Sequence, residues 1–214
     1  MTRLLGAVIV CAALLPASLG AQGFQFTVGG VVAQEIVQSH VDQVSDRFTG
    51  LVLGGEGALA SGRFVARLRY GEGRINPQAG DSSAPRDVVE GEAMFGFHAT
   101  PWLTLWAGPS ARAYTMGDTN QRWLIWTGRV TGRGTLMPGR MQTFVELWGA
   151  VSGNVGTPAL KAGGRGANAG LEVRMGQESP FWGRLGYRIE STHADGLRET
   201  VESLTLSVMY GFPQ

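Results

Sequence analysis

The chain has 214 residues, enough for one domain with a sizeable core and too few for two comfortable ones. Its 18 basic and 17 acidic residues give a formal net charge of +1, so no basic excess points to a nucleic-acid partner. The single cysteine, Cys11, lies near the start of the chain, which excludes disulfides and thiolate chemistry from everything after it.

The first segment of the chain has the pattern of a secretory signal peptide. Arg3 is its only charge, an apolar run follows from Leu4 to Leu15, and small residues come next. The alternative, a retained anchor helix, is disfavoured because about 12 apolar residues are too few to span a roughly 30 Å hydrocarbon layer. The sequence therefore predicts a cleaved signal peptide over residues 1–21 and a single domain over residues 22–214.

From Gln22 onward, apolar and polar residues alternate at period two rather than at the helical 3.6. Residues 204–212 are the clearest case, with leucine, valine, tyrosine and phenylalanine on one face. No stretch outlines a long amphipathic helix. With boundaries uncertain by about two to four residues, the pattern predicts ten strands, at 24–33, 49–60, 62–72, 87–99, 102–113, 122–135, 141–151, 166–176, 181–190 and 200–212.

The connections between these strands differ in predicted length. Long ones, at 34–48, 73–86, 114–121, 152–165 and 191–199, follow the odd-numbered strands. Short ones, at 61, 100–101, 136–140 and 177–180, follow the even-numbered strands. Alternation of long loops with tight turns is typical of outer-membrane barrels, and an even strand count returns both termini to one end. The sequence therefore predicts a closed antiparallel up-and-down transmembrane β-barrel of ten strands, with eight as the alternative count.

The polar face of the predicted strands is expected to point inward, because an outer-membrane barrel has lipid outside and a polar lumen inside. Charges of both signs occur in the middle of these strands, and cross-strand pairs such as Glu56 with Arg67, or Arg69 with Glu90, would neutralise them. Unpaired charges would be costly in a narrow lumen. The predicted lumen charge network comprises Glu56, Arg67, Arg69, Glu90, Glu92, Arg112, Arg129, Arg133, Glu146, Glu172, Arg174, Arg184, Arg188 and Glu202.

Aromatic residues gather near the strand ends, as in the two belts that mark the membrane interfaces of a barrel. The predicted turn-side belt contains Phe24, Phe26, Phe97, Trp102, Phe181, Tyr210 and Phe212. The predicted loop-side belt contains Phe48, Tyr70, Tyr114, Trp123 and Trp148. The alternative interpretation is that aromatic residues are simply common in strands.

Over residues 22–214 the chain resembles the small outer-membrane β-barrel proteins of Gram-negative bacteria. Residues 204–212 are similar to the C-terminal assembly signal of that class, although Pro213 and Gln214 follow the final aromatic residue. The resemblance implies insertion into the cell outer membrane by the barrel-assembly machinery, with periplasmic chaperones as transient partners. It also implies contact with outer-membrane lipid and lipopolysaccharide, and we expect a monomer. The class does not imply one function.

Motifs for catalysis or cofactor binding are weak, and we expect no catalytic residue, cofactor or metal. The segment 163–166 lacks the strand-to-helix context of a phosphate loop, and no Gly-x-Ser-x-Gly elbow is present. One rim candidate combines His40 and Asp42 with His193 and Asp195, which become neighbours if the first and last strands pair. Two imidazoles and two carboxylates could bind a metal such as zinc, or position a base beside a hydroxyl. Polar loops also contain such residues by chance.

Two enzyme families of the outer membrane have partly similar motifs. His193 and Asp195 resemble the Asp-His pair of omptin proteases, in reversed order and without a partner aspartate pair on the strands. Residues 188–194 resemble the His-x-Ser motif of lipid A deacylases, but Glu190 and Thr192 replace its histidine and serine. The sequence therefore predicts neither activity for this chain.

Three functions remain for a barrel of this kind. The first is a surface structural or interaction protein with a charged, plugged lumen and extracellular loops. The alternatives are a small channel or porin, and a lipid- or peptide-modifying enzyme at the rim. A ten-strand lumen is narrow, and arginine–glutamate pairs and tryptophans would fill it, which favours the first.

Overall fold

The computed structural model describes residues 23–41, 44–78, 83–117, 119–156 and 160–211. The predicted signal peptide, Asp42 and Phe212 therefore lie outside the described residues. The described chain forms ten strands: β1 (Phe24–Val41), β2 (Val44–Ser61), β3 (Phe64–Pro77), β4 (Arg86–Thr100), β5 (Leu103–Met116), β6 (Thr119–Met137), β7 (Met141–Val155), β8 (Leu160–Arg174), β9 (Phe181–Ala194) and β10 (Leu197–Gly211).

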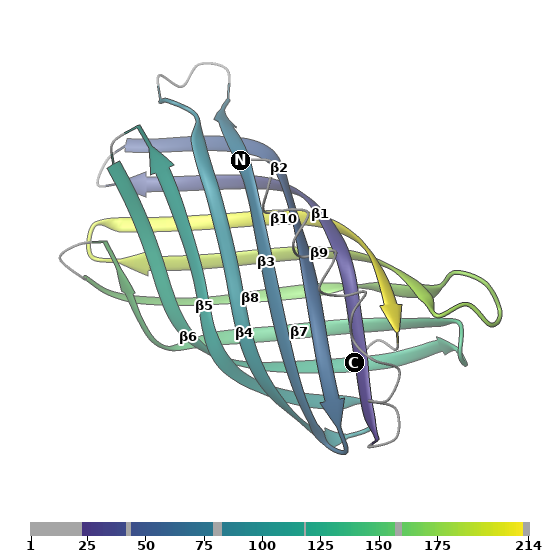
Figure 1. Ribbon diagram of the computed structural model, residues 1–214. Coiled ribbons are helices and arrows are strands. Elements are labelled where there is room, and N and C mark those ends of the chain that lie inside the picture. Colours follow the sequence, from purple (N-terminus) through teal and green to yellow (C-terminus); the bar gives the residue numbers. More distant parts are fainter. Residues whose placement is uncertain (1–22, 42–43, 79–82, 118, 157–159, 212–214) are drawn as a thin grey trace.

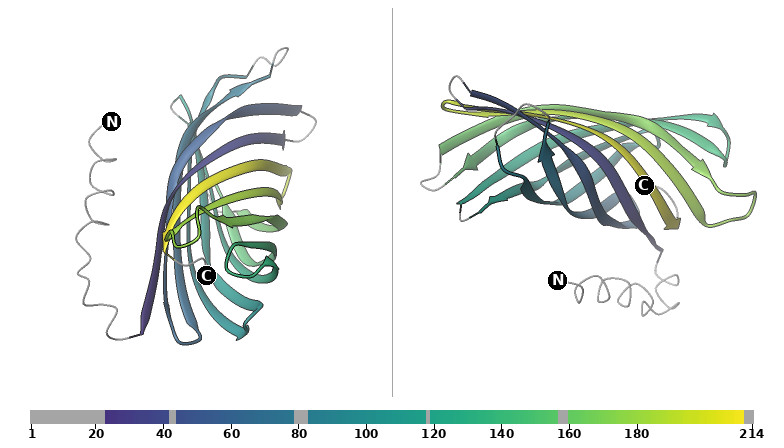
Figure 2. Two further views of the ribbon diagram at one scale, coloured as in Figure 1. Left: turned by 90° about the vertical axis from the view of Figure 1, so that its right-hand side faces the viewer. Right: turned by 90° about the horizontal axis from the view of Figure 1, so that it is seen from above.

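The strands form one closed antiparallel barrel in which each strand pairs with its neighbours in sequence and β1 pairs with β10. The strands lean in one direction, so β3 and β4 cross β7 and β8 on the opposite wall steeply (Figure 1). β1 and β10 stay side by side in the two further views (Figure 2). The described residues contain no helix that could cross a membrane. The predicted ten-stranded up-and-down barrel is confirmed, and the alternative of eight strands is wrong.

The strands extend beyond their predicted ends, and the prediction of long loops after odd-numbered strands is wrong except after β3, where 78–85 separate β3 from β4. β1 continues to Val41 and β2 begins at Val44, so most of the predicted loop 34–48 is strand. The segments 114–121 and 191–199 are likewise mostly strand. We call the end where β1 begins and β10 finishes the turn end, and the opposite end the distal end.

The strands were predicted too short because the chemistry of their two faces is exchanged near the distal end. On β3, Leu68 and Tyr70 are exposed on the outer face, while Arg69 points inward. Further along the same strand, Arg74 is exposed on the outer face and Ile75 is fully buried inside. The backbone keeps its period of two, but the apolar residues change sides, and a hydrophobic pattern therefore breaks although the strand continues.

The outer face of the barrel between the turn end and this exchange is an exposed apolar band. Phe95 and Leu206 are exposed by 73% and 57%, and many other exposed side chains around them are apolar. Such a surface is far larger than the apolar patches of soluble monomers and matches the lipid-facing band of a membrane barrel. The exposed large apolar residues of the band include Phe26, Val32, Leu51, Leu53, Leu59, Phe64, Leu68, Val89, Phe97, Leu105, Val145, Leu147, Leu185, Leu204 and Val208.

An aromatic belt borders the band at the turn end, as predicted. The rings of Phe26 and Phe181 lie 6.0 and 5.4 Å from that of Tyr210, measured between centroids. Phe64 extends the belt through Phe97, at 5.6 Å. The predicted loop-side belt is wrong, because only Tyr70 of its members is exposed on the outer face; Phe48, Tyr114, Trp123 and Trp148 are buried inside the barrel.

Three of these inward aromatic residues, Phe48, Tyr114 and Trp123, belong to an apolar cluster that fills the distal part of the barrel, which we call the distal core. It consists of Ala33, Val37, Phe48, Val52, Ile75, Val88, Tyr114, Trp123, Ile125, Val155 and Val201. The strands that enclose it are closely spaced. A Cβ atom on Gly54 would collide with the carbonyl oxygen of Tyr70, so this position requires glycine.

Candidate functional site: the interior ion-pair network

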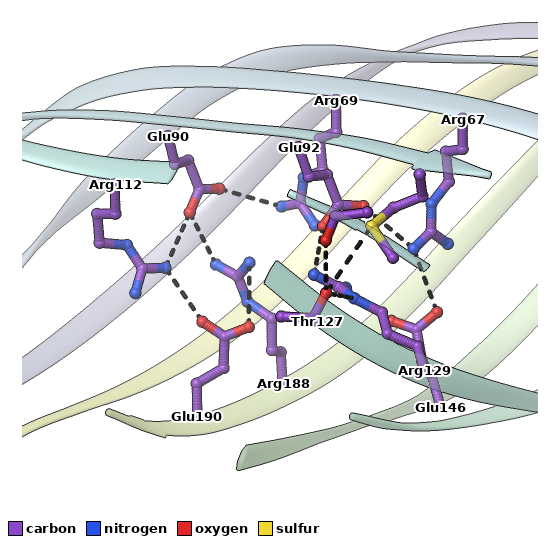
Figure 3. Close-up of polar contacts among 12 residues, drawn as sticks. Arg67, Arg69, Glu90, Glu92, Arg112, Thr127, Arg129, Glu146, Arg188 and Glu190 are labelled. Carbon is purple, nitrogen blue, oxygen red and sulfur yellow. Dashed lines mark hydrogen bonds and ion pairs between the residues drawn. The ribbon is translucent and has the colours of Figure 1, made fainter. Parts of the chain in front are cut away.

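Between the distal core and the turn end, the interior of the barrel is filled by arginine and glutamate side chains from most of its strands. They form three groups in succession along the barrel, and Figure 3 shows most of the distal and middle groups. The alternation of each strand positions them, because residues at i and i+2 point to the same face. Most of these side chains are only 0 to 19% exposed.

The distal group is centred on two arginines that each bind more than one carboxylate. Arg188 on β9 lies 2.7 Å from Glu35 and 3.1 Å from Glu90. Arg112 on β5 lies 2.9 Å from Glu90 and 3.3 Å from Glu190 (Figure 3). Glu90 is therefore shared by two guanidinium groups that come from opposite parts of the barrel wall.

Three further side chains complete the distal group. Arg69 on β3 also contacts Glu90, at 3.4 Å. Glu199 on β10 lies 3.7 Å from Arg112 and accepts a hydrogen bond of 2.8 Å from the hydroxyl of Tyr114. Because Tyr114 belongs to the distal core, this bond joins the network directly to the apolar cluster above it.

The middle group is a closed ring of two arginines and two glutamates. Arg67 lies 3.1 Å from Glu92 and 3.2 Å from Glu146, and Arg129 lies 2.9 Å from Glu92 and 3.1 Å from Glu146. Each charge therefore has two partners of opposite sign, which is the arrangement that buried ion pairs need. The guanidinium group of Arg67 also lies over the ring of Trp106, at 4.7 Å.

The turn-end group is less evenly paired. Arg184 contacts Glu56 at 3.0 Å and Glu172 at 2.6 Å, while Gln142 donates a hydrogen bond of 2.6 Å to Glu172. Arg133 approaches Glu172 only to 3.8 Å, through its Nε atom. Arg133 is thus the least well paired of the arginines in the three groups.

The three groups differ in their balance of charge. The middle and turn-end groups each contain two arginines and two glutamates, whereas the distal group has three arginines and four glutamates. In this group Oε2 of Glu35 and Oε2 of Glu199 are buried without a hydrogen-bond partner among the described residues, as are Nε of Arg112 and Nε of Arg188. Repulsion between carboxylates is therefore concentrated in the distal group.

Most residues of the predicted network lie in these groups, but two do not. Arg174 donates to the backbone oxygens of Ser179 and Gln177 at the turn end. Glu202 is on the outer face with Leu204, where the hydroxyl of Tyr187 donates to it at 3.0 Å. The period-two pattern of residues 203–212 already assigns Glu202 to the apolar face, so its placement in the lumen was an error of phase.

Sequence reasoning also missed members of the network. Glu35 and Glu199 lie in the segments 34–48 and 191–199, which the sequence predicts to be loops, and a loop assignment gives a side chain no inward or outward direction. Glu190 shares the inward face of its strand with Arg188 and Arg184, but the predicted network does not include it. Of the two example pairs, Arg69 does contact Glu90, whereas Glu56 pairs across the lumen with Arg184 rather than with Arg67.

The rim candidate is only partly brought together. His193 on β9 and His40 on β1 both stand opposite Arg198 of β10, so an arginine separates the two imidazoles. Asp42 lies outside the described residues, and Asp195 is in the turn after β9. Across the described ranges no group of three or more histidine, cysteine, aspartate or glutamate side chains is arranged to hold a metal ion.

Comparison with known proteins identifies the architecture. No protein-family model and no curated protein sequence matches the chain. Among solved structures, the outer-membrane protease OmpT of Escherichia coli is similar, with a TM-score of 0.58 and 8% identity over 88% of this chain and 97% of that chain. The fold is that of an outer-membrane β-barrel.

Other solved barrels are similar over comparable lengths. The translocator domain of the autotransporter NalP from Neisseria meningitidis gives a TM-score of 0.46 at 15% identity, covering 97% of this chain and 96% of that chain. An outer-membrane channel from Pseudomonas putida F1 gives 0.48 at 12% identity, covering 88% and 96%. At these identities the likeness concerns the fold of the barrel alone, because one fold hosts many activities.

Proposed function

We propose that this protein is a non-conducting barrel of the bacterial outer membrane that acts at the cell surface. The contact would be made by the outer face of its distal section, by which we mean the part of the barrel that encloses the distal core. The observation that carries the proposal is the filling of the barrel along its length. The distal core is succeeded by three groups of paired charges. The void lined by side chains of the middle and turn-end groups has a volume of only about 30 Å³.

The membrane location is supported by the exposed apolar band and its aromatic belt. In water, an exposed apolar surface of this extent would cause the protein to aggregate, whereas the hydrocarbon chains of a membrane solvate it. A cleaved signal peptide over residues 1–21 would direct the chain to export, and the closed β1–β10 pairing leaves no open sheet edge for lipid to face.

The closed lumen is supported by the burial of the side chains that cross it. Phe48, Ile75 and Tyr114 of the distal core are each fully buried. Below them, the void bounded by Glu56, Arg67, Trp106, Arg184 and Met209 has a volume of about 30 Å³, which is room for about one water molecule. Ions could pass only if several of these side chains moved together.

The surface role is supported by the outer face of the distal section, which is polar and rich in basic side chains. His193, Arg198 and His40 form a row across β9, β10 and β1, and all three are exposed. Arg165 and Lys161 on β8 are exposed on the same side of the barrel. Directly above an apolar band, such a face suits the phosphate groups of lipopolysaccharide, the anionic lipid of the outer leaflet.

Conductance tests the closed lumen. Purified protein inserted into planar bilayers should give no stable current steps, while a porin inserted in the same way should. Insertion is verified on the same sample by the heat-dependent shift in gel migration that intact barrels show. Regular conductance steps from verified protein would overturn the closed lumen and favour the channel.

Lipopolysaccharide binding tests the surface role. The substitution Arg198→Glu reverses one charge in the exposed row, and we expect less lipopolysaccharide to copurify with that variant. Arg140→Glu makes the same change in the turn between β6 and β7, at the opposite end of the barrel, and should retain the wild-type amount. Equal retention by both variants would contradict the proposed contact.

A further inference from the structure

The turn-end mouth of the barrel contains a cavity that the proposed function does not use. Its volume is about 400 Å³, within the range of 300 to 1,000 Å³ that is usual for small-molecule sites. It lies between the turn ends of β1, β4, β6 and β7. Its lining consists of Gln25, Arg63, His98, Thr100, Pro101, Arg133 and Gln142.

The cavity ends inside the barrel. Arg133 lines both this cavity and the void of about 30 Å³ behind it. Beyond that void, Arg184 and Glu56 are joined across the lumen at 3.0 Å, and the middle group follows. A molecule could therefore enter and leave only through the mouth at the turn end.

The ionisable groups of the lining are all bases. They are Arg63, Arg133 and His98, and the other lining residues supply amides, a hydroxyl and a proline. A cavity lined by potential cations without a carboxylate has a positive potential, and its low-dielectric walls concentrate that field. Its charge therefore favours an anion.

Arg133 is only weakly paired with the carboxylates of the barrel. Its Nε atom is buried and has no hydrogen-bond partner among the described residues. The nearest carboxylate, Glu172, is 3.8 Å away and already contacts Arg184 at 2.6 Å and accepts from Gln142 at 2.6 Å. Arg133 thus has no close carboxylate of its own, and a guanidinium group in a site with little water is costly unless an acceptor reaches it.

We propose that this cavity is a binding pocket for a small oxyanion, a carboxylate or phosphate compound, held between Arg63 and Arg133. A guanidinium group presents its donors in a planar fork that matches both kinds of anion. Thr100 and Gln25 offer further polar atoms at the rim. The pocket goes beyond the surface role, because it opens at the opposite end of the barrel.

Calorimetric titration of the processed protein, purified in a non-ionic detergent, tests the pocket. Inorganic phosphate and succinate are the probes, and the uncharged diamide of succinate is the control ligand. We expect saturable binding of at least one anion and none of the diamide. No saturable binding of either anion, or equal binding of the diamide, would overturn the proposal.

Substitutions locate the binding. Arg63→Gln changes an exposed residue of the β2–β3 turn, so it should fold normally, and loss of its charged hydrogen bonds should weaken binding about tenfold or more. Arg133→Gln should have a similar effect. Arg165→Gln removes the same charge from the outer face of β8 and should bind like the wild type. Binding that is unchanged in Arg63→Gln, or weakened equally in Arg165→Gln, would show that the anion binds elsewhere.

Discussion

The two ends of a single strand of this barrel have opposite distributions of apolar and charged residues on their inner and outer faces. Toward the turn end of β3, the outward residue Leu68 is exposed and apolar, while its neighbour Arg67 is inside. Toward the distal end of the same strand, the outward residue Arg74 is charged and exposed, while Ile75 inside is fully buried. β6 repeats the exchange, with Arg129 inside near its middle and Ile125 inside nearer the distal end.

This difference indicates that the two sections face different solvents. The section with apolar residues outside suits lipid, which requires that charges be enclosed and paired. The section with apolar residues inside is organised like a soluble β-barrel, with a hydrophobic core and a polar surface. The distal section would accordingly project beyond the membrane into water, and the predictions below test each side of the comparison.

The largest effect is expected from removing a shared cation in the lipid-facing section. Arg188→Met leaves Glu35 without its ion-pair partner and deprives Glu90 of one of its three arginines. A buried charge left unpaired costs about 3 to 5 kcal/mol. The free energy of unfolding, measured by urea titration in lipid vesicles, should fall by that amount. Arg165→Met, on the exposed outer face of β8, is the matched control and should change it by less than about 0.5 kcal/mol.

A somewhat smaller effect is expected in the distal core. Phe48→Ala removes a fully buried ring, which costs about 3 kcal/mol, the lower end for such truncations. The guanidinium group of Arg86, 3.8 Å from the centre of the ring, can partly fill the space. The same urea titration measures the loss. A change near zero would mean that the distal section does not form a packed core.

An arginine introduced on the outer face should destabilise the lipid-facing section much more than the water-facing section. Leu206→Arg introduces a charge in the apolar band and should destabilise the inserted barrel by about 2 to 3 kcal/mol. Gln38→Arg introduces the same charge on the outer face of β1 in the distal section, where the expected change is about 0.5 kcal/mol or less. A similar decrease in the free energy of unfolding for both substitutions would contradict the distinction between a lipid-facing and a water-facing section.

The smallest effect, of opposite sign, is expected for the surplus carboxylate of the distal group. Glu35→Gln balances the three arginines with three glutamates and removes an unpaired charged oxygen, so stability should rise by up to about 1 kcal/mol. Glu146→Gln, made in the balanced middle group, should instead lower stability, because Arg67 and Arg129 both lose a charged partner. If Glu35→Gln lowered the free energy of unfolding as much as Glu146→Gln, the inference that the distal group contains one carboxylate in excess would be contradicted.

The sequence predicts the barrel well because period-two alternation is a local signal. Strand number, closure and the inward direction of Arg67, Glu92 and Arg129 all follow from it. It predicts the strand ends poorly, because the apolar residues of β1 lie on the outer face at Val32 and on the inner face at Val37. The alternation of apolar and polar residues is interrupted between these two positions. Most segments that the sequence predicts as long loops are therefore strand ends, with apolar residues on the inner face and polar residues on the outer face.

The pairing within the network depends on geometry that no single strand contains. Glu56 meets Arg184 across the lumen although the two residues are 128 positions apart, and Arg188 meets Glu35 at a separation of 153. Such contacts are set by strand tilt and by side-chain length, neither of which alternation reveals. The surplus charge of the distal group likewise depends on Glu199, which the sequence had assigned to a loop.

Spin labels on the outer face provide the most direct test of the exchange of faces. With Cys11→Ser as background, single cysteines at Leu206 and at Gln38 can be labelled in protein reconstituted into lipid bilayers. The label at 206 should collide with oxygen, which concentrates in lipid, and be shielded from a water-soluble nickel chelate, whereas the label at 38 should show the reverse. Equal access of the nickel chelate to both labels would contradict the central claim that the wall of the barrel passes from lipid into water toward its distal end.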